Sequence, residues 1–288
     1  MGVAALVTSV ALAPHAAPGA AATRATPSAA RPCGVAGAGH DYTHVVWIIE
    51  ENVGYAVVGS PAAPYFNALA SRCALATNYH AAGHPSLPNY VALTSGSTQG
   101  ITDDGEPSSH PLAVSSIFSQ LRGRWRAYAQ SMPRPCDRTT SGVYAARHNP
   151  AVYYVNLGAA CPRDDVNLPA HPTFSAPFTL VVPNVCDDMH SCPIATGDAW
   201  LRSFVPEVLA SPPYRAGSLV LVITFDESDA SATNLVPTVV IAPSVPAGLR
   251  VTVPLTHYSL LRTTEQLLGL APLGAAAHAR SMLAPFHL

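Results

Sequence analysis

The sequence predicts an α/β protein built around a largely parallel sheet, and three observations support this fold class. Short continuous runs of apolar and β-branched residues recur along the chain. Stretches with helical periodicity lie between these runs, an alternation typical of a parallel sheet covered by helices on both sides. The 288-residue chain is also 49% apolar and only 11% charged, which is enough to form a sizeable core.

The expected elements follow one another along almost the whole chain. The first strand is the run HVVWII at residues 44–49, and the strongest is SLVLVITF at residues 218–225. Gly96 and Gly269 follow two helical stretches in the position where glycine commonly ends a helix. The full set of expected strands is 44–49, 178–182, 218–225 and 238–242. The full set of expected helices is 64–76, 87–95, 115–121, 198–210 and 257–268.

Polar residues follow three of these strands directly. The first strand is followed by Glu51 and Asn52, the strand at 178–182 by Asn184 and Asp188, and the strand at 218–225 by an Asp-Glu pair. Ligands of parallel sheets bind beyond the carboxyl ends of the strands. A single polar residue often does no more than mark a strand end, but acids or amides after three strands predict a functional site.

The oxygens expected at the carboxyl ends of these strands are suited to a divalent cation. Carboxylate and amide oxygens are hard ligands, and Glu51, Asn52, Asp226 and Glu227 supply most of one coordination sphere. A cation would also offset the repulsion among three clustered carboxylates, which are costly to bury unpaired. We therefore expect one divalent metal ion of unspecified identity.

Ser86 is the candidate nucleophile. It precedes an expected helix that has Pro88 in its first turn, and a helix N-terminus directs free N–H groups at a bound anion. A serine there is either a plain helix cap or a nucleophile activated by a base or metal. Other serine chemistries lack their motifs: there is no Gly-x-Ser-x-Gly and no lysine, and Tyr90 replaces the arginine of the sulfatase pattern.

Cationic side chains are needed to hold phosphoryl oxygens and to protonate a leaving group. There are four candidates: His190 follows the strand at 178–182, His257 opens the helix at 257–268, and Arg147 and His148 lie in the run Arg147-His148-Asn149-Pro150. For each single histidine a purely structural role is the alternative, because the chain has 12 histidines and most of them must be structural.

The first 32 residues are interpreted as a signal peptide and linker ahead of a catalytic domain at residues 33–288. Residues 2–12 are apolar, too short to span a bilayer, and followed by small residues suited to cleavage. No positive charge precedes the apolar run, so a plain disordered linker is the alternative. We expect a secreted protein without stable membrane insertion.

Six cysteines in an exported chain predict three disulfides, and six cysteines permit 15 pairings. We expect the local pairing Cys33–Cys73, Cys136–Cys161 and Cys186–Cys192. A zinc site is the alternative, but no Cys-x-x-Cys pair supports it.

The net charge of −2 gives no sign of nucleic-acid binding, and the absence of lysine excludes a P-loop nucleotide hydrolase. We expect a monomer.

The motifs together resemble the bacterial phosphoesterase family of the alkaline-phosphatase-like superfamily, which includes acid phosphatases and phospholipases C. The similarity runs from about residue 44 to residue 270. It rests on Glu51-Asn52, the segment 84–90 with Thr94-Ser95-Gly96, the segment 144–148, Pro183-Asn184 with Asp188-Met189-His190 and 197–201, Phe225-Asp226-Glu227, His257-Tyr258 and Glu265-Gln266. The resemblance implies a three-layer sandwich with a largely parallel central sheet.

The resemblance also implies a phosphoserine mechanism. Ser86 would attack phosphorus, activated by the metal on Glu51, Asn52, Asp226 and Glu227. Asn89 would hold a phosphoryl oxygen, and His190 and His257 would bind phosphate or protonate the leaving oxygen. Asp188 would orient a histidine or bind a second metal, while Arg147 and His148 would contact the substrate.

The expected activity is that of a phosphomonoesterase acting on small organic phosphates or phosphoinositide headgroups. A phospholipase C or another phosphodiesterase is the alternative within enzymes. The short chain favours the monoesterase, because the phospholipase C members of the resembled family are considerably longer. A catalytically silent surface-binding protein with the same fold is the alternative from another class.

Overall fold

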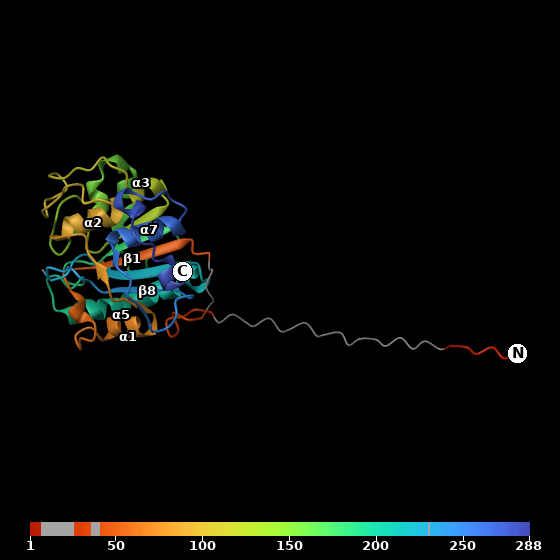
Figure 1. Ribbon diagram of the computed structural model, residues 1–288. Coiled ribbons are helices and arrows are strands. Elements are labelled where there is room, and N and C mark those ends of the chain that lie inside the picture. Colours follow the sequence, from red (N-terminus) through yellow and green to blue (C-terminus); the bar gives the residue numbers. More distant parts are fainter. Residues whose placement is uncertain (7–25, 36–40, 230) are drawn as a thin grey trace.

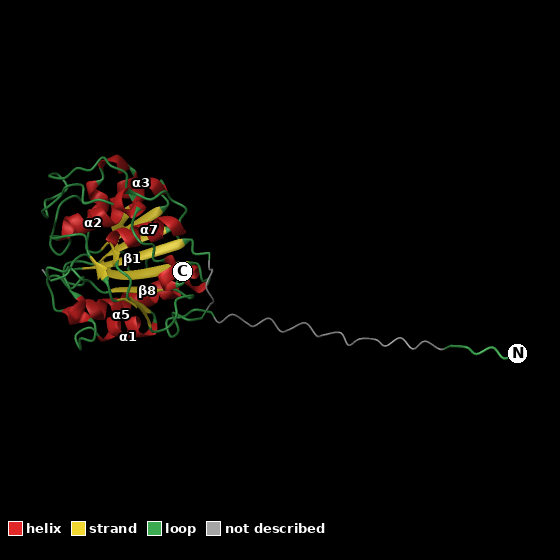
Figure 2. Cartoon of the chain, in the orientation of Figure 1, coloured by secondary structure: helices red, strands yellow, loops and turns green. Residues whose placement is uncertain are grey.

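The computed structural model describes residues 1–6, 26–35, 41–229 and 231–288. A central sheet lies between two layers of helices, with α2, α3 and α7 on one face and α1 and α5 on the other (Figure 1, Figure 2). The expected signal peptide falls largely on residues 7–25, which lie outside the described residues. The α/β three-layer prediction is confirmed.

The main sheet has eight strands in the order β5-β4-β6-β1-β7-β8-β2-β9. Strand β1 pairs in parallel with β6 on one side and β7 on the other, and β8 is antiparallel to both of its neighbours. A second sheet joins β3 and β10. The strands are β1 (His44–Glu50), β2 (Ala74–Ala76), β3 (Tyr79–His80), β4 (Trp125–Ala129), β5 (Asp165–Asn167), β6 (Phe178–Val182), β7 (Leu219–Phe225), β8 (Thr238–Ile241), β9 (Leu249–Val251) and β10 (Leu255–Thr256).

The helices cover a sheet whose central strands are buried throughout. Every residue of β6 and β7 is buried, as the continuous apolar runs predict. The α-helices are α1 (Pro64–Arg72), α2 (Ser86–Ser95), α3 (Ile117–Leu121), α4 (Ala160–Asp164), α5 (Ile194–Ala210), α6 (Pro212–Arg215), α7 (His257–Leu267) and α8 (Leu283–Phe286). Short 3₁₀ helices are η1 (Tyr55–Val57), η2 (Ala146–His148), η3 (Pro150–Tyr153), η4 (Val155–Leu157) and η5 (Gly274–Ala277).

Two expected helix boundaries are wrong by four residues each, and the helix expected at 115–121 begins at Ile117. The helix expected at 64–76 ends at Arg72, because the three residues of β2 pair with both β8 and β9 instead. The helix expected to start at Asp198 starts at Ile194. Asp198 lies inside α5 and accepts hydrogen bonds from the first backbone N–H groups of α1, which fixes one helix on the other.

The three expected disulfides are all present, as Cys33–Cys73, Cys136–Cys161 and Cys186–Cys192. The last of these closes a short loop after β6 that carries Asp188 and His190. Over the described part of the chain, helices that combine the length and apolarity needed to cross a bilayer are absent.

Candidate active site

Strands β1 and β7 end side by side and place the expected metal-binding residues next to one another. Glu50 pairs with Phe225, and the Asp226 N–H donates to the Glu50 carbonyl over 2.9 Å. Asn52 has a φ of +47°, a conformation that asparagine tolerates, and its N–H donates to Asp226 Oδ1 over 3.1 Å. This turn brings the Asn52 side chain back over the strand ends.

Ser86 is the first residue of α2 and is only 2% exposed. Its hydroxyl donates to Glu51 Oε2 over 3.0 Å and lies 3.3 Å from Asn52 Oδ1 and 3.5 Å from Glu227 Oε1. The fold thus brings the expected nucleophile, at the start of α2, against three of the four expected metal ligands, which come from the two segments after β1 and β7.

The carboxyl groups at this edge lie close together and are buried. Burial, followed by the charges of Asp226 and Asp188, raises the pKa of Glu51 well above its usual range. Burial, followed by the charge of Glu227, raises the pKa of Asp226 to about 7. Burial also raises the pKa of Glu227 to about 7, with the charge of Asp104 as the second cause. The acids therefore need protons or a cation between them.

The donor set fits a hard divalent cation. Asp226 Oδ2 is buried and has no hydrogen-bond partner, so one carboxylate oxygen is left for a ligand. The Asn52 amide faces the oxygens of two carboxylates. Rotating it places its NH₂ group 3.1 Å from Glu227 Oε1 and 3.2 Å from Glu51 Oε2. The amide can thus offer its oxygen to a cation or, without one, donate to the acids.

His148 and Asp188 form a buried pair beside Glu51. His148 Nδ1 lies 3.2 Å from Asp188 Oδ2, and the ring stacks on Tyr90. Its Nε2 lies 3.3 Å from Glu51 Oε2 but makes no hydrogen bond. Burial, with the nearby charge of Arg147, lowers the pKa of His148 well below its usual range. The structure thus places Asp188 against a neutral imidazole, and the expected role of Asp188 in orienting that ring stays a prediction.

Arg147 and His190 lie at the partly exposed side of the site. Arg147 Nη2 lies 3.5 Å from the ring atom Nε2 of His190. The backbone N–H of His190 donates to Asp188 Oδ1 over 2.8 Å. His190, His148 and Glu51 also hold one ligand atom each within 4.8 Å of one another, a grouping that suits a second cation. Arg147 and His190 thus mark a partly exposed position next to the buried acids.

Asn89 and His257 do not face that position. The Asn89 oxygen accepts from the N–H groups of Ala82 and Gly83, and its NH₂ donates to the Gly83 and Pro85 carbonyls. All its hydrogen-bonding capacity is therefore used to shape the loop ahead of Ser86.

His257 is fully buried behind the strand end. Its Nε2 lies 2.6 Å from the Asp226 carbonyl and its Nδ1 lies 3.1 Å from the Tyr79 hydroxyl. Burial lowers the pKa of His257 to about 4. Contrary to the expected contact with phosphate, the ring supports the backbone that carries Asp226.

Three further residues complete the site. The Tyr90 hydroxyl donates to Glu51 Oε1 over 2.5 Å, and His84 Nδ1 contacts Glu227 Oε2. Asp104 Oδ1 accepts from the Leu87 N–H over 2.9 Å. Tyr90 lies one helical turn after Ser86, so helical spacing alone points to it. Asp104 lies in the loop after α2, 17 residues beyond Leu87, and carries no comparable signal.

Fold and site together define a hydrolase of phosphoric esters with an alkaline-phosphatase-like architecture. The chain belongs to the phosphoesterase family, whose model matches residues 59–271. It is 34% identical over 250 residues to a phosphatidylinositol-3-phosphatase of Mycobacterium tuberculosis, covering 83% of this chain and 81% of that protein. The chain is a phosphatase, as the sequence predicts.

More distant similarities agree on the fold. The chain is 30% identical to a phosphate-repressible acid phosphatase of Penicillium chrysogenum over 72% of this chain, but it spans only 54% of that protein. A solved alkaline phosphatase superfamily protein from Vibrio parahaemolyticus superposes with a TM-score of 0.54 and 11% identity, covering 80% of this chain and 67% of that one. At that identity the likeness supports the fold alone.

Proposed function

We propose that this chain is a secreted, metal-dependent phosphomonoesterase that works through a phosphoserine on Ser86. The observation that carries the proposal is the position of the Ser86 hydroxyl. It lies at the N-terminus of α2, within 3.5 Å of oxygens from Glu51, Asn52 and Glu227. The catalytic domain is taken to be residues 33–288, after a signal peptide and linker at 1–32.

The reaction proceeds in two balanced halves. Ser86 Oγ bonds to phosphorus as the bond from phosphorus to the ester oxygen breaks, and the serine proton passes to Glu51 Oε2. Protonated His190 on the open side gives its proton to the departing alcohol. Water then attacks the phosphoserine, His190 takes up its proton, the Ser86 oxygen regains a proton from Glu51, and inorganic phosphate leaves.

One divalent cation on Glu51, Asn52, Asp226 and Glu227 would neutralise the buried acids and lower the pKa of the Ser86 hydroxyl. The surrounding residues keep this arrangement in place. Tyr90 holds the second oxygen of Glu51, and Asp188 fixes the ring of His148 beside it. A second cation on Glu51, His148 and His190 is compatible with the side chains but is not required by the proposal.

The substrate is proposed to be a phosphate monoester. A monoester dianion has three terminal oxygens to be held, and Arg147, His190 and the first-turn N–H groups of α2 supply donors around one phosphorus. The similarity to a phosphatidylinositol-3-phosphatase extends the proposal to phosphoinositide monophosphates. A diesterase of phospholipase C type is the alternative, and it would need fewer cationic donors.

Comparing p-nitrophenyl phosphate with bis-p-nitrophenyl phosphate tests the assignment. The monoester should be hydrolysed faster, and Arg147→Ala should raise its KM by about tenfold or more while changing residual diester cleavage little. Arg215→Ala is the matched control, because this arginine is exposed in α6. Faster cleavage of the bis-ester or of phosphatidylcholine would favour the phospholipase C alternative. Hydrolysis of either substrate by the wild type, lost on replacing Ser86, would exclude a silent binding protein.

A further inference from the structure

Asp104 lies in the phosphoryl-binding part of the proposed site. It belongs to the loop after α2 and reaches back over the start of that helix. Its Oδ1 accepts from the Leu87 N–H over 2.9 Å, and its Oδ2 lies 3.9 Å from Arg147 Nε. Its side chain is 36% exposed and that of Arg147 is 24% exposed, so the contact faces the open side of the site.

Both groups held by Asp104 are donors that a transferred phosphoryl group needs. A phosphoryl group bonding to Ser86 Oγ lies beside the N–H of the next residue, Leu87, at the positive end of a ten-residue helix. Pro88 has no N–H, so the first turn has few other donors to offer. The guanidinium of Arg147 also adjoins His190, with Nη2 3.5 Å from His190 Nε2.

The carboxylate of Asp104 lies against the same two donors that would hold the phosphoryl oxygens, the Leu87 N–H and the Arg147 guanidinium. An acid so close to a bound phosphate dianion would repel it, unless the acid moves aside.

We propose that Asp104 is an internal anion that occupies the phosphoryl position and must be displaced by the substrate. This inference rests on the proposed phosphomonoesterase activity and adds a positioning residue to it. Asp104 keeps Arg147 and the Leu87 N–H oriented in the free enzyme, and it weakens binding of any phosphate ligand. It thereby favours release of inorganic phosphate after the phosphoserine is hydrolysed.

Asp104→Asn tests this without removing the acceptor for the Leu87 N–H. The asparagine oxygen can still accept that hydrogen bond, but the negative charge is lost. Inorganic phosphate should inhibit the variant about tenfold more strongly than the wild type, and KM for p-nitrophenyl phosphate should fall in parallel. Asp103→Asn is the matched control, since this adjacent exposed acid bonds His110 instead.

A phosphate inhibition constant that is unchanged or weaker in Asp104→Asn would overturn the proposal, and so would an equal effect in Asp103→Asn. Calorimetric titration with inorganic phosphate, on protein supplied with divalent cation, gives the same comparison without turnover. If the wild type binds phosphate but hydrolyses no monoester, the proposed function fails while the titration still decides the role of Asp104. A normal melting temperature in both variants separates the effect from a loss of folding.

Discussion

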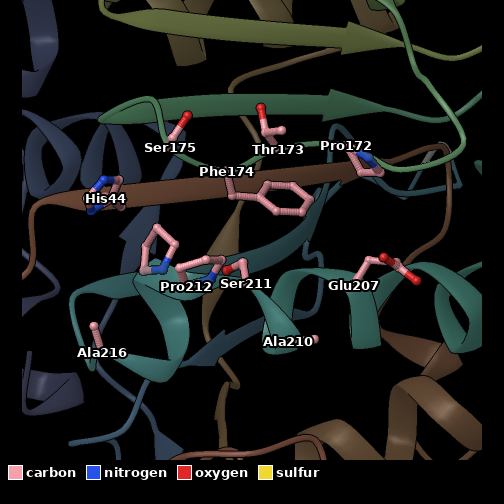
Figure 3. Close-up of a pocket in the computed structure, with 11 residues that line it drawn as sticks. His44, Pro172, Thr173, Phe174, Ser175, Glu207, Ala210, Ser211, Pro212 and Ala216 are labelled. Atoms are coloured by element: carbon pink, nitrogen blue, oxygen red, sulfur yellow. The ribbon is translucent and has the colours of Figure 1, made fainter.

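The two ends of strand β1 differ in what they bury. At its start, His44 lines an apolar cavity of about 620 Å³ together with Phe174, Ala210, Pro212 and other residues (Figure 3). At its end, the chain continues into Glu51 and Asn52 among buried acids. The lining of this cavity includes one acid, Glu207, and one histidine, His44, and the two form no ion pair with each other.

This difference teaches where to look for function in a parallel sheet. Cavity size follows imperfect packing between loops and helices, and a large apolar groove is stable without a ligand. Buried carboxyls with raised pKa values are costly and persist only where something compensates them. The unpartnered Asp226 Oδ2 therefore favours the carboxyl end as the site over the apolar groove.

Replacing Ser86 should have the largest effect. Ser86→Ala removes the atom that becomes phosphorylated, so kcat for p-nitrophenyl phosphate should fall by about three orders of magnitude or more. The variant should remain folded, because the change only removes a hydroxyl from a group of acids. Ser203→Ala, on the opposite helix layer in α5, is the control. A variant that keeps a tenth of the wild-type rate would show that Ser86 is not the nucleophile.

Removing the cation should have the second largest effect. Chelation should abolish activity, and a single type of divalent ion should restore it. Asp226→Asn should weaken metal binding and kcat together, by about 10- to 100-fold, whereas Glu207→Gln at the groove end should change neither. Activity in protein shown by elemental analysis to be metal-free would contradict this prediction.

The same acids give the metal-free protein a characteristic pH dependence. The pKa values of Asp226 and Glu227 are about 7 in the fold and near 4 in unfolded chains, so the folded state binds more protons. Their contribution to stability is full below about pH 4 and is lost as the pH rises through about 7. The melting temperature of metal-free protein should therefore fall between pH 5 and 8, and added cation should raise it more at pH 8.

Much of this contrast could be predicted from the sequence. Continuous apolar runs located β1, β6 and β7, and their ends identified Glu51, Asn52, Asp188 and Asp226. The sequence pattern does not predict strand β4, because Trp125–Ala129 includes Arg126 and is neither a continuous apolar run nor a clean alternation of apolar and polar residues. Local patterns find residues at the ends of regular elements, but they do not find residues brought in by long loops, such as Asp104.

The orientation of a side chain was harder to predict than its position. Asn89 and His257 do lie on the elements expected, α2 and α7, and both are within the site region. Their side chains nevertheless turn to backbone groups of neighbouring loops and strands. Whether a polar side chain faces ligand or backbone depends on which backbone groups the tertiary fold leaves unpaired, and sequence spacing does not reveal that.

Filling the groove at the start of β1 should have the smallest effect. Ala210 ends α5, is exposed, and lines the groove with Phe174 and Pro212 (Figure 3). Ala210→Trp should bury apolar area there and shift the melting temperature by only about 2 °C or less, because a surface residue with space around it makes few obligatory contacts. The kcat/KM for p-nitrophenyl phosphate should stay within about twofold of the wild type, since the chemistry lies at the other end of the strands. A tenfold loss with normal folding would connect the groove to substrate binding and remove the contrast between the two ends.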